Sequence, residues 1–168
     1  MIRFSTLDVE MPPIEPQKVK AWIGEVVARH GKTVGELYYY FCSDEKLLEI
    51  NRERLGHDFY TDIVTFPLTD CETVLSSEFC ISVDRIKENA VTFGRSYESE
   101  LHRVIIHGVL HLIGFDDHTE EDEKEMRNQE EKALELLIED TTPKPHTVMA
   151  DDDPPSPLRG DKTSQIGD

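Results

Sequence analysis

Hydrophobic and polar positions along the first half of the chain alternate in the manner of short strands. The segment IRFSTLDV at the start is typical of an edge strand, and residues 33–43 (TVGELYYYFCS) are rich in β-branched and aromatic side chains. Residues 61–68 (TDIVTFPL) predict a core strand that ends at Pro67, and residues 76–83 (SSEFCISV) predict another strand. The chain therefore contains several short strands separated by segments with a different period.

Those other segments have the spacing of helices. Five are expected, over residues 16–30, 43–55, 84–94, 96–112 and from 119 onward. The first has a clear apolar stripe: Val19, Trp22, Ile23, Val26 and Val27. The fourth has Ser96 or Ser99 as its N-cap. The last has a thin apolar stripe until Ala133, Leu134, Leu137 and Ile138, so most of it is expected to be a solvated face.

Strands that alternate with helices, with the later helices gathered together, predict an α/β (α+β) fold in which helices cover a small mixed sheet. Residues 1–140 are expected to form one domain. Residues 141–168 are rich in Pro, Asp, Ser and Gly without periodic apolar positions, which predicts a disordered, acidic, Pro-rich tail.

Composition and net charge limit the cellular compartment and the partners expected for this protein. No apolar run is long enough to span a bilayer, and the start of the chain lacks the apolar core of a signal peptide, so a cytoplasmic protein is expected. The three cysteines have no paired spacing and are expected to be reduced. The net charge of −17 repels polyanions and by itself argues against nucleic acid, although a local cationic site or a bound metal outweighs a distant field.

The most informative stretch is HGVLHLIGFDDH, residues 107–118. Four positions on a helix turn a side chain by roughly 400°, so His107 and His111 point the same way about 6 Å apart and can chelate one ion. Gly114 ends the helix, which puts a metal site at the end of a central helix, with a third ligand from the turn that follows. Such a mixed N/O site, with a position left for water, is typical of catalytic Zn2+. The alternative is that both histidines are core or boundary residues.

A zinc protease would carry Glu directly after the first histidine, where this chain has Gly108. That difference disfavours peptide hydrolysis by the protease mechanism. A glycine at this position also allows the close approach of a substrate backbone or of another segment of the chain.

The stretch HGVLHLIGFDDH resembles the HGxLHLxGxDH signature of the YbeY family of rRNA maturation factors. TDIVTFP (61–67), Asn51 and ISVDRIKENA support the resemblance, which covers roughly residues 35–138. It implies a zinc-dependent, single-strand-specific endoribonuclease that binds one Zn2+ and has His107 and His111 at its catalytic centre. It also implies 16S rRNA 3′ end processing, ribosome quality control, and the ribosomal small subunit or its proteins as partners. No membrane partner is expected, and the sequence leaves the oligomeric state open.

The turn after the helix departs from the family's pattern. The family's third ligand is a histidine ten residues after the first, and Asp117 stands there, with His118 one position later. Register favours Asp117 and ligand type favours His118, so both stay candidates for the metal. Asp116 is a candidate to orient a ligand histidine or a metal-bound water.

Cationic groups near the motif are the second departure. Leu55 stands where the family has an arginine, and Arg52, Arg54 and His57 are nearby. The two arginines fit a solvated helix face at least as well as a phosphate contact. Arg103 lies one turn before His107 and is a weak catalytic candidate, as a second positive group, or else a partner of Glu98 or Glu100.

Two other functions fit the same motif. One is a metal-dependent hydrolase with a different substrate, such as a small phosphoester. The other is a non-catalytic ribosome-assembly binder in which the metal is structural.

Overall fold

The protein, represented by a computed structural model, is described over residues 1–141, with side chains described up to residue 137. Four strands form one sheet: β1 (Ile2–Thr6), β2 (Thr33–Cys42), β3 (Ile63–Pro67) and β4 (Val74–Ser82). Their order is β1-β2-β4-β3; β1, β2 and β4 are parallel, whereas β3 pairs antiparallel with β4. The sheet is therefore mixed, as predicted. The tail predicted from residue 141 lies outside the described residues except for Thr141.

Within residues 1–141, six helical segments accompany the sheet: α1 (Pro16–Arg29), α2 (Asp44–Ile50), the π-helical turn η1 (Asn51–Leu55), α3 (Val83–Phe93), α4 (Tyr97–Ile113) and α5 (Glu120–Thr141). They lie where the hydrophobic period predicts helices. Of the two predicted caps, Ser96 is the N-cap of α4, and its Oγ accepts a hydrogen bond from the Ser99 amide at 3.0 Å. Among the described residues, no helix combines the length and apolar character needed to cross a membrane.

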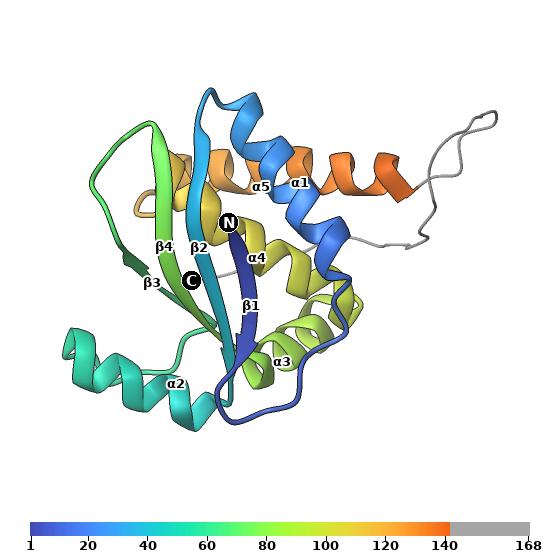
Figure 1. Cartoon of the computed structure of the whole chain (residues 1–168). Coiled ribbons are helices and arrows are strands. Elements are labelled where there is room, and N and C mark those ends of the chain that lie inside the picture. The colour runs from blue at the N-terminus through green and yellow to red at the C-terminus, as the bar shows by residue number, and fades with distance from the viewer. Residues whose placement is uncertain (142–168) are drawn as a thin grey trace.

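The two faces of the sheet carry different helices (Figure 1). Side chains alternate between faces along each strand, so neighbouring residues of β2 belong to separate cores. Tyr39 and Phe41 join the large core with α1, α3, α4 and α5, whereas Tyr40 and Cys42 join a small core with Leu47 of α2. The helix α4 lies inside the large core, and eleven of its residues are buried.

The predicted position of β3 in the sheet is wrong, because β3 lies at an edge and not in the middle. Its burial fades toward Pro67, whereas β4 is buried through its second half. Proline lacks the amide hydrogen that a central strand donates to a neighbour, so Pro67 is compatible with an edge strand.

The glycine at position 108 sets the distance between α4 and the sheet. A Cβ atom there would lie 2.7 Å from Cε1 of Phe79 and 3.0 Å from Cδ1 of Ile63. Real Cβ atoms do not come so close to an aromatic ring, so this position needs glycine. Of the two expectations for Gly108, the approach of another chain segment is the one the structure contains. Ile63 is the first residue of β3, so this close packing holds α4 at Gly108 against the start of β3.

Candidate metal centre

Three ligand groups converge at the end of α4. One ligand atom from each of His107, His111 and Asp117 lies within 4.8 Å of the other two. The Oδ2 atom of Asp117 is 3.7 Å from Nε2 of His107 and 3.6 Å from Nε2 of His111. The two imidazole rings lie 4.6 Å apart at an interplanar angle of 85°. One ion can therefore be reached by two ring nitrogens and one carboxylate oxygen.

The chain reverses after α4, and this turn brings Asp117 to the histidines. Gly114 has a φ of +130°, a conformation that glycine adopts readily, and the amide of Phe115 donates to the Leu110 carbonyl at 3.0 Å. Asp117 is partly buried beside the rings, whereas Asp116 and His118 are exposed. The converging group thus includes Asp117 and excludes His118, and Asp116 lies outside it.

Burial differs between the two histidines. His107 is 2% exposed, and burial, reinforced by the neighbouring His111, lowers its pKa well below the usual value. It is therefore neutral at physiological pH and keeps a lone pair for a metal. The side chain of His111 is 26% exposed. A cavity of about 230 Å³ opens beside the centre; its lining residues are Arg103, His107, Asp117, Glu123, Met126, Arg127 and Glu130.

Glu130 of α5 fixes the orientation of the first histidine. Its Oε2 lies 2.6 Å from Nδ1 of His107, and its Oε1 accepts from Nη1 of Arg103 at 2.7 Å. Burial raises the pKa of Glu130 to about 7, and the positive charge of Arg103 opposes that shift. In the neutral imidazole one nitrogen carries the proton, so a carboxylate at Nδ1 keeps the proton there and leaves Nε2 unprotonated. Nε2 is the atom that faces Asp117.

Arg103 lies between buried carboxylates. Besides Glu130, it contacts Glu100 at 3.2 Å, and that carboxylate is fully buried. The sequence left Glu98 and Glu100 as possible partners of Arg103, and the structure forms the pair with Glu100. Among the described residues, no contact between Arg103 and Glu98 is formed. A third buried carboxylate near Arg103 is Asp62, which is 3% exposed and directly precedes β3. Burial raises the pKa of Asp62 to about 7, and the positive charge of Arg103 opposes that rise. The guanidinium thus lines the cavity while paired on two sides.

Sequence reasoning missed Glu130 and Asp62. A signal for Glu130 was present, because Met126, Glu130, Ala133, Leu134 and Leu137 share the apolar period of α5 and all are buried. A carboxylate on such a stripe requires a buried partner. Asp62 had no comparable signal.

The cationic residues upstream of β3 do not join the centre. Arg52 pairs with Asp58 at 2.6 Å, and the guanidinium of Arg54 lies 4.1 Å from the ring centre of Phe66. The ring of His57 stacks on the ring of Phe59. These residues are exposed on and after η1.

The donor set fits a divalent transition metal. Two imidazole nitrogens and one carboxylate oxygen suit Zn2+, and three protein ligands leave coordination positions open. The neutral state of His107 and the carboxylate behind it are features expected of a histidine that binds metal. The residues present can therefore hold one ion.

Comparison with known proteins gives consistent results. Residues 6–138 match the family described as Endoribonuclease YbeY. The Endoribonuclease YbeY of Porphyromonas gingivalis is 49% identical over 138 residues, which cover 82% of this chain and 91% of that protein. That of Phocaeicola vulgatus is 47% identical over 137 residues, which cover 82% and 99%. The solution structure of TM1509 from Thermotoga maritima superposes with a TM-score of 0.63 and 28% identity, over 83% of this chain and 91% of that one.

Proposed function

This chain belongs to the endoribonuclease YbeY family, which makes it a hydrolase acting on RNA, and we propose that it cleaves single-stranded RNA with one zinc ion held by His107, His111 and Asp117. The observation that carries the proposal is the convergence of these three ligand groups within 4.8 Å beside an open cavity. His118 is exposed and is not part of this converging group, which favours Asp117 as the third ligand.

The chain's own groups have separate tasks in this proposal. A bound divalent ion would supply Lewis-acid polarisation of water and of a phosphoryl oxygen. Glu130 holds the proton of His107 at Nδ1, so that Nε2 stays a donor to the ion. The positive charge of Arg103 opposes the rise in the pKa of Glu130 that burial causes, and so favours the ionised form of Glu130. The guanidinium also lies at the cavity wall, where it would meet a phosphate group. Arg103, a weak catalytic candidate from the sequence, therefore acts in this proposal mainly by positioning Glu130.

The substrate proposed is ribosomal RNA, at the 3′ end of 16S rRNA, with a part in ribosome quality control in the cytoplasm. A net charge of −17 makes free RNA a poor partner, whereas RNA presented on a ribosomal particle is easier to approach. The first turn of α5 is acidic, with Glu120, Glu121, Asp122 and Glu123, and it offers a contact for basic proteins of the small subunit. Neutralising the acidic residues from 120 to 125 should weaken binding to 30S particles; unchanged affinity would remove this partner.

The cleavage test compares wild type with His111→Ala. Zinc-loaded wild type should cut a single-stranded oligoribonucleotide and leave the matching duplex intact. The His111→Ala protein should lose cleavage and bound zinc, while its circular dichroism stays that of a folded protein. A His118→Ala control should retain both. If His111→Ala lost zinc and thermal stability yet still supported rRNA processing in cells, the ion would be structural and the proposal wrong.

A further inference from the structure

The turn after η1 carries two exposed aromatic rings whose placement the metal centre does not explain. We propose that the rings of His57 and Phe59 form a platform on which bases of single-stranded RNA stack. This proposal rests on the endoribonuclease function and adds to it a contact for the substrate outside the metal centre.

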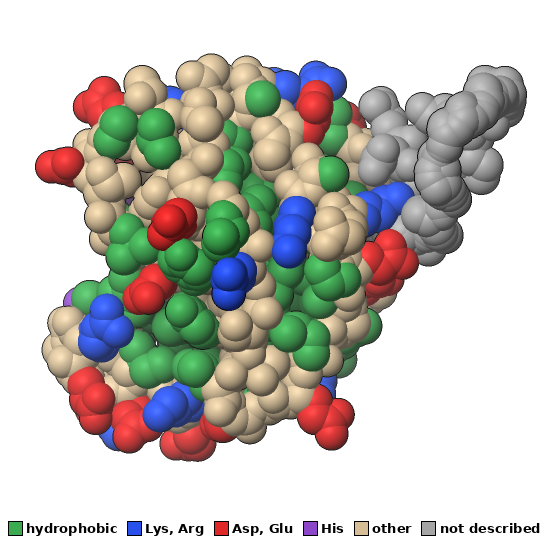
Figure 2. Space-filling model, in the orientation of Figure 1, with side chains coloured by type: hydrophobic (Ala, Val, Ile, Leu, Met, Phe, Trp, Pro, Cys, Tyr) green, Lys and Arg blue, Asp and Glu red, His purple; other side chains and the backbone are tan. Residues whose placement is uncertain are grey.

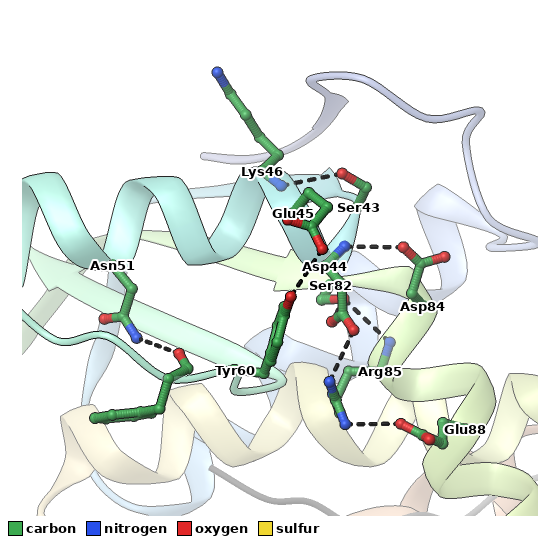
Figure 3. Close-up of polar contacts among 11 residues, drawn as sticks. Ser43, Asp44, Glu45, Lys46, Asn51, Tyr60, Ser82, Asp84, Arg85 and Glu88 are labelled. Atoms are coloured by element: carbon green, nitrogen blue, oxygen red, sulfur yellow. Dashed lines mark hydrogen bonds and ion pairs between the residues drawn. The ribbon is translucent and has the colours of Figure 1, made fainter.

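The backbone of this turn is held in place by hydrogen bonds. Asn51 is 1% exposed, and its Nδ2 donates to the carbonyl of Phe59 at 3.1 Å, while its own carbonyl accepts from the amide of His57 at 3.2 Å. Gly56, with a φ of +70°, allows the reversal. At the far end the Tyr60 hydroxyl donates to Glu45 at 2.8 Å (Figure 3). The turn is therefore ordered before any ligand arrives, which lowers the entropy lost on binding.

The two rings are arranged for stacking. Their centres lie 5.2 Å apart with an interplanar angle of 19°, and Phe59 is 54% exposed even though its backbone is fixed. Because the backbone of Phe59 is fixed and about half of its side chain is exposed, much of the ring surface is available to a ligand. Bases of single-stranded RNA offer flat faces to such rings, and stacking tolerates any sequence.

The charge around the platform is compatible with RNA. Residues 51–60 (NRERLGHDFY) contain two arginines and two acidic residues, so the segment is neutral in a chain of −17. On the face drawn in Figure 2, hydrophobic side chains are exposed between the sheet and α2 as well as elsewhere, with basic and acidic side chains among them. One of the two arginines, Arg52, is occupied by Asp58 at 2.6 Å, in a pair that is largely exposed. An RNA phosphate would compete with Asp58 for that guanidinium.

The platform lies within reach of the metal centre along the chain. Phe59 precedes Ile63 by four residues, a stretch of at most about 14 Å when fully extended. Ile63 packs at Gly108, next to the ligand His107. A strand of RNA stacked on the turn is thus a short distance from the cavity, which a few nucleotides of an extended strand cover.

The experiment measures binding by fluorescence anisotropy of a labelled single-stranded oligoribonucleotide, with chelator present so that no cleavage occurs. Phe59→Ala should raise the Kd about tenfold, the loss expected for one stacked base, and Phe59→Trp should restore binding. Phe93→Ala is the matched control, because Phe93 is 60% exposed on α3. Replacing bases of the oligonucleotide by abasic sites should abolish the difference between wild type and Phe59→Ala.

A gain of affinity provides a second criterion that misfolding does not mimic. Asp58→Asn removes one negative charge and releases Arg52, so it should tighten RNA binding a few-fold at low salt. The platform proposal would be overturned if wild type and Phe59→Ala bound RNA with equal affinity. It would also be overturned if Phe59→Ala changed only the self-association of the protein in sedimentation. Zinc-dependent cleavage that is lost in His107→Ala would still stand in that case, so the two failures are distinguishable.

Discussion

Replacing Glu130 by alanine removes the carboxylate that accepts from Nδ1 of His107 at 2.6 Å and from Arg103 at 2.7 Å. The ring of His107 then lacks the carboxylate that favours a proton on Nδ1, so a larger fraction of the molecules should carry the proton on Nε2, the proposed metal-binding atom. Arg103 keeps its contact with Glu100, in a site where the Arg103 side chain is 11% exposed.

The expected size of the effect follows from these contacts. Loss of a carboxylate behind a metal-binding histidine weakens metal affinity by roughly 10- to 100-fold, which corresponds to about 1.4 to 2.8 kcal/mol. Removing one partner of a buried ion pair costs up to about 3 to 5 kcal/mol in unfolding free energy. The lower end is expected here, because Glu100 still contacts Arg103. Glu130→Gln should lie between wild type and alanine, since the amide oxygen still accepts from Nδ1.

Zinc affinity is measured by competition with a chromophoric chelator, and the tautomer of His107 by the nitrogen chemical shifts of its ring in the metal-free protein. Glu131→Ala is the matched control, one residue further along α5 and exposed. A zinc affinity of Glu130→Ala within about twofold of wild type, with an unchanged tautomer, would refute the role given to Glu130.

Three further predictions concern the ligand set, the packing of α4 and pH. Asp117→Ala should lose stoichiometric zinc by mass spectrometry while His118→Ala keeps it; the opposite pattern would make His118 the third ligand. Gly108→Ala should lower the unfolding free energy by about 1 to 3 kcal/mol, because its Cβ would lie 2.7 Å from Phe79; an unchanged melting temperature would contradict this packing. Burial raises the pKa of Asp62 to about 7, so the folded protein binds this proton more tightly than the unfolded chain does. The unfolding free energy should therefore fall from about pH 4 to pH 7 and then level off, and Asp62→Asn should flatten that slope in denaturant titrations.

The local pattern of apolar and polar residues was sufficient to predict the helices and strands and two residues of the candidate metal centre. Helices and strands follow from the spacing of apolar residues, because burying one face requires a fixed period. The pair His107 and His111 follows from helix geometry alone, since four residues complete about one turn. The resemblance of residues 107–118 to a known signature supplied the family, which the comparisons confirm.

The remaining features depend on segments that meet only in the folded chain. The sequence did not place β3 at the edge, because strand order is decided by pairing across the whole sheet. It left Asp117 and His118 open, because the direction of a side chain in a turn depends on how that turn packs. It missed Glu130, 23 residues from His107 along the chain, because a buried carboxylate is explained only by the groups that other helices bring to it. The sequence by itself thus determined the helices and strands and placed His107 and His111 on one helix face, because both depend on local spacing. Tertiary packing decided which groups surround these two histidines.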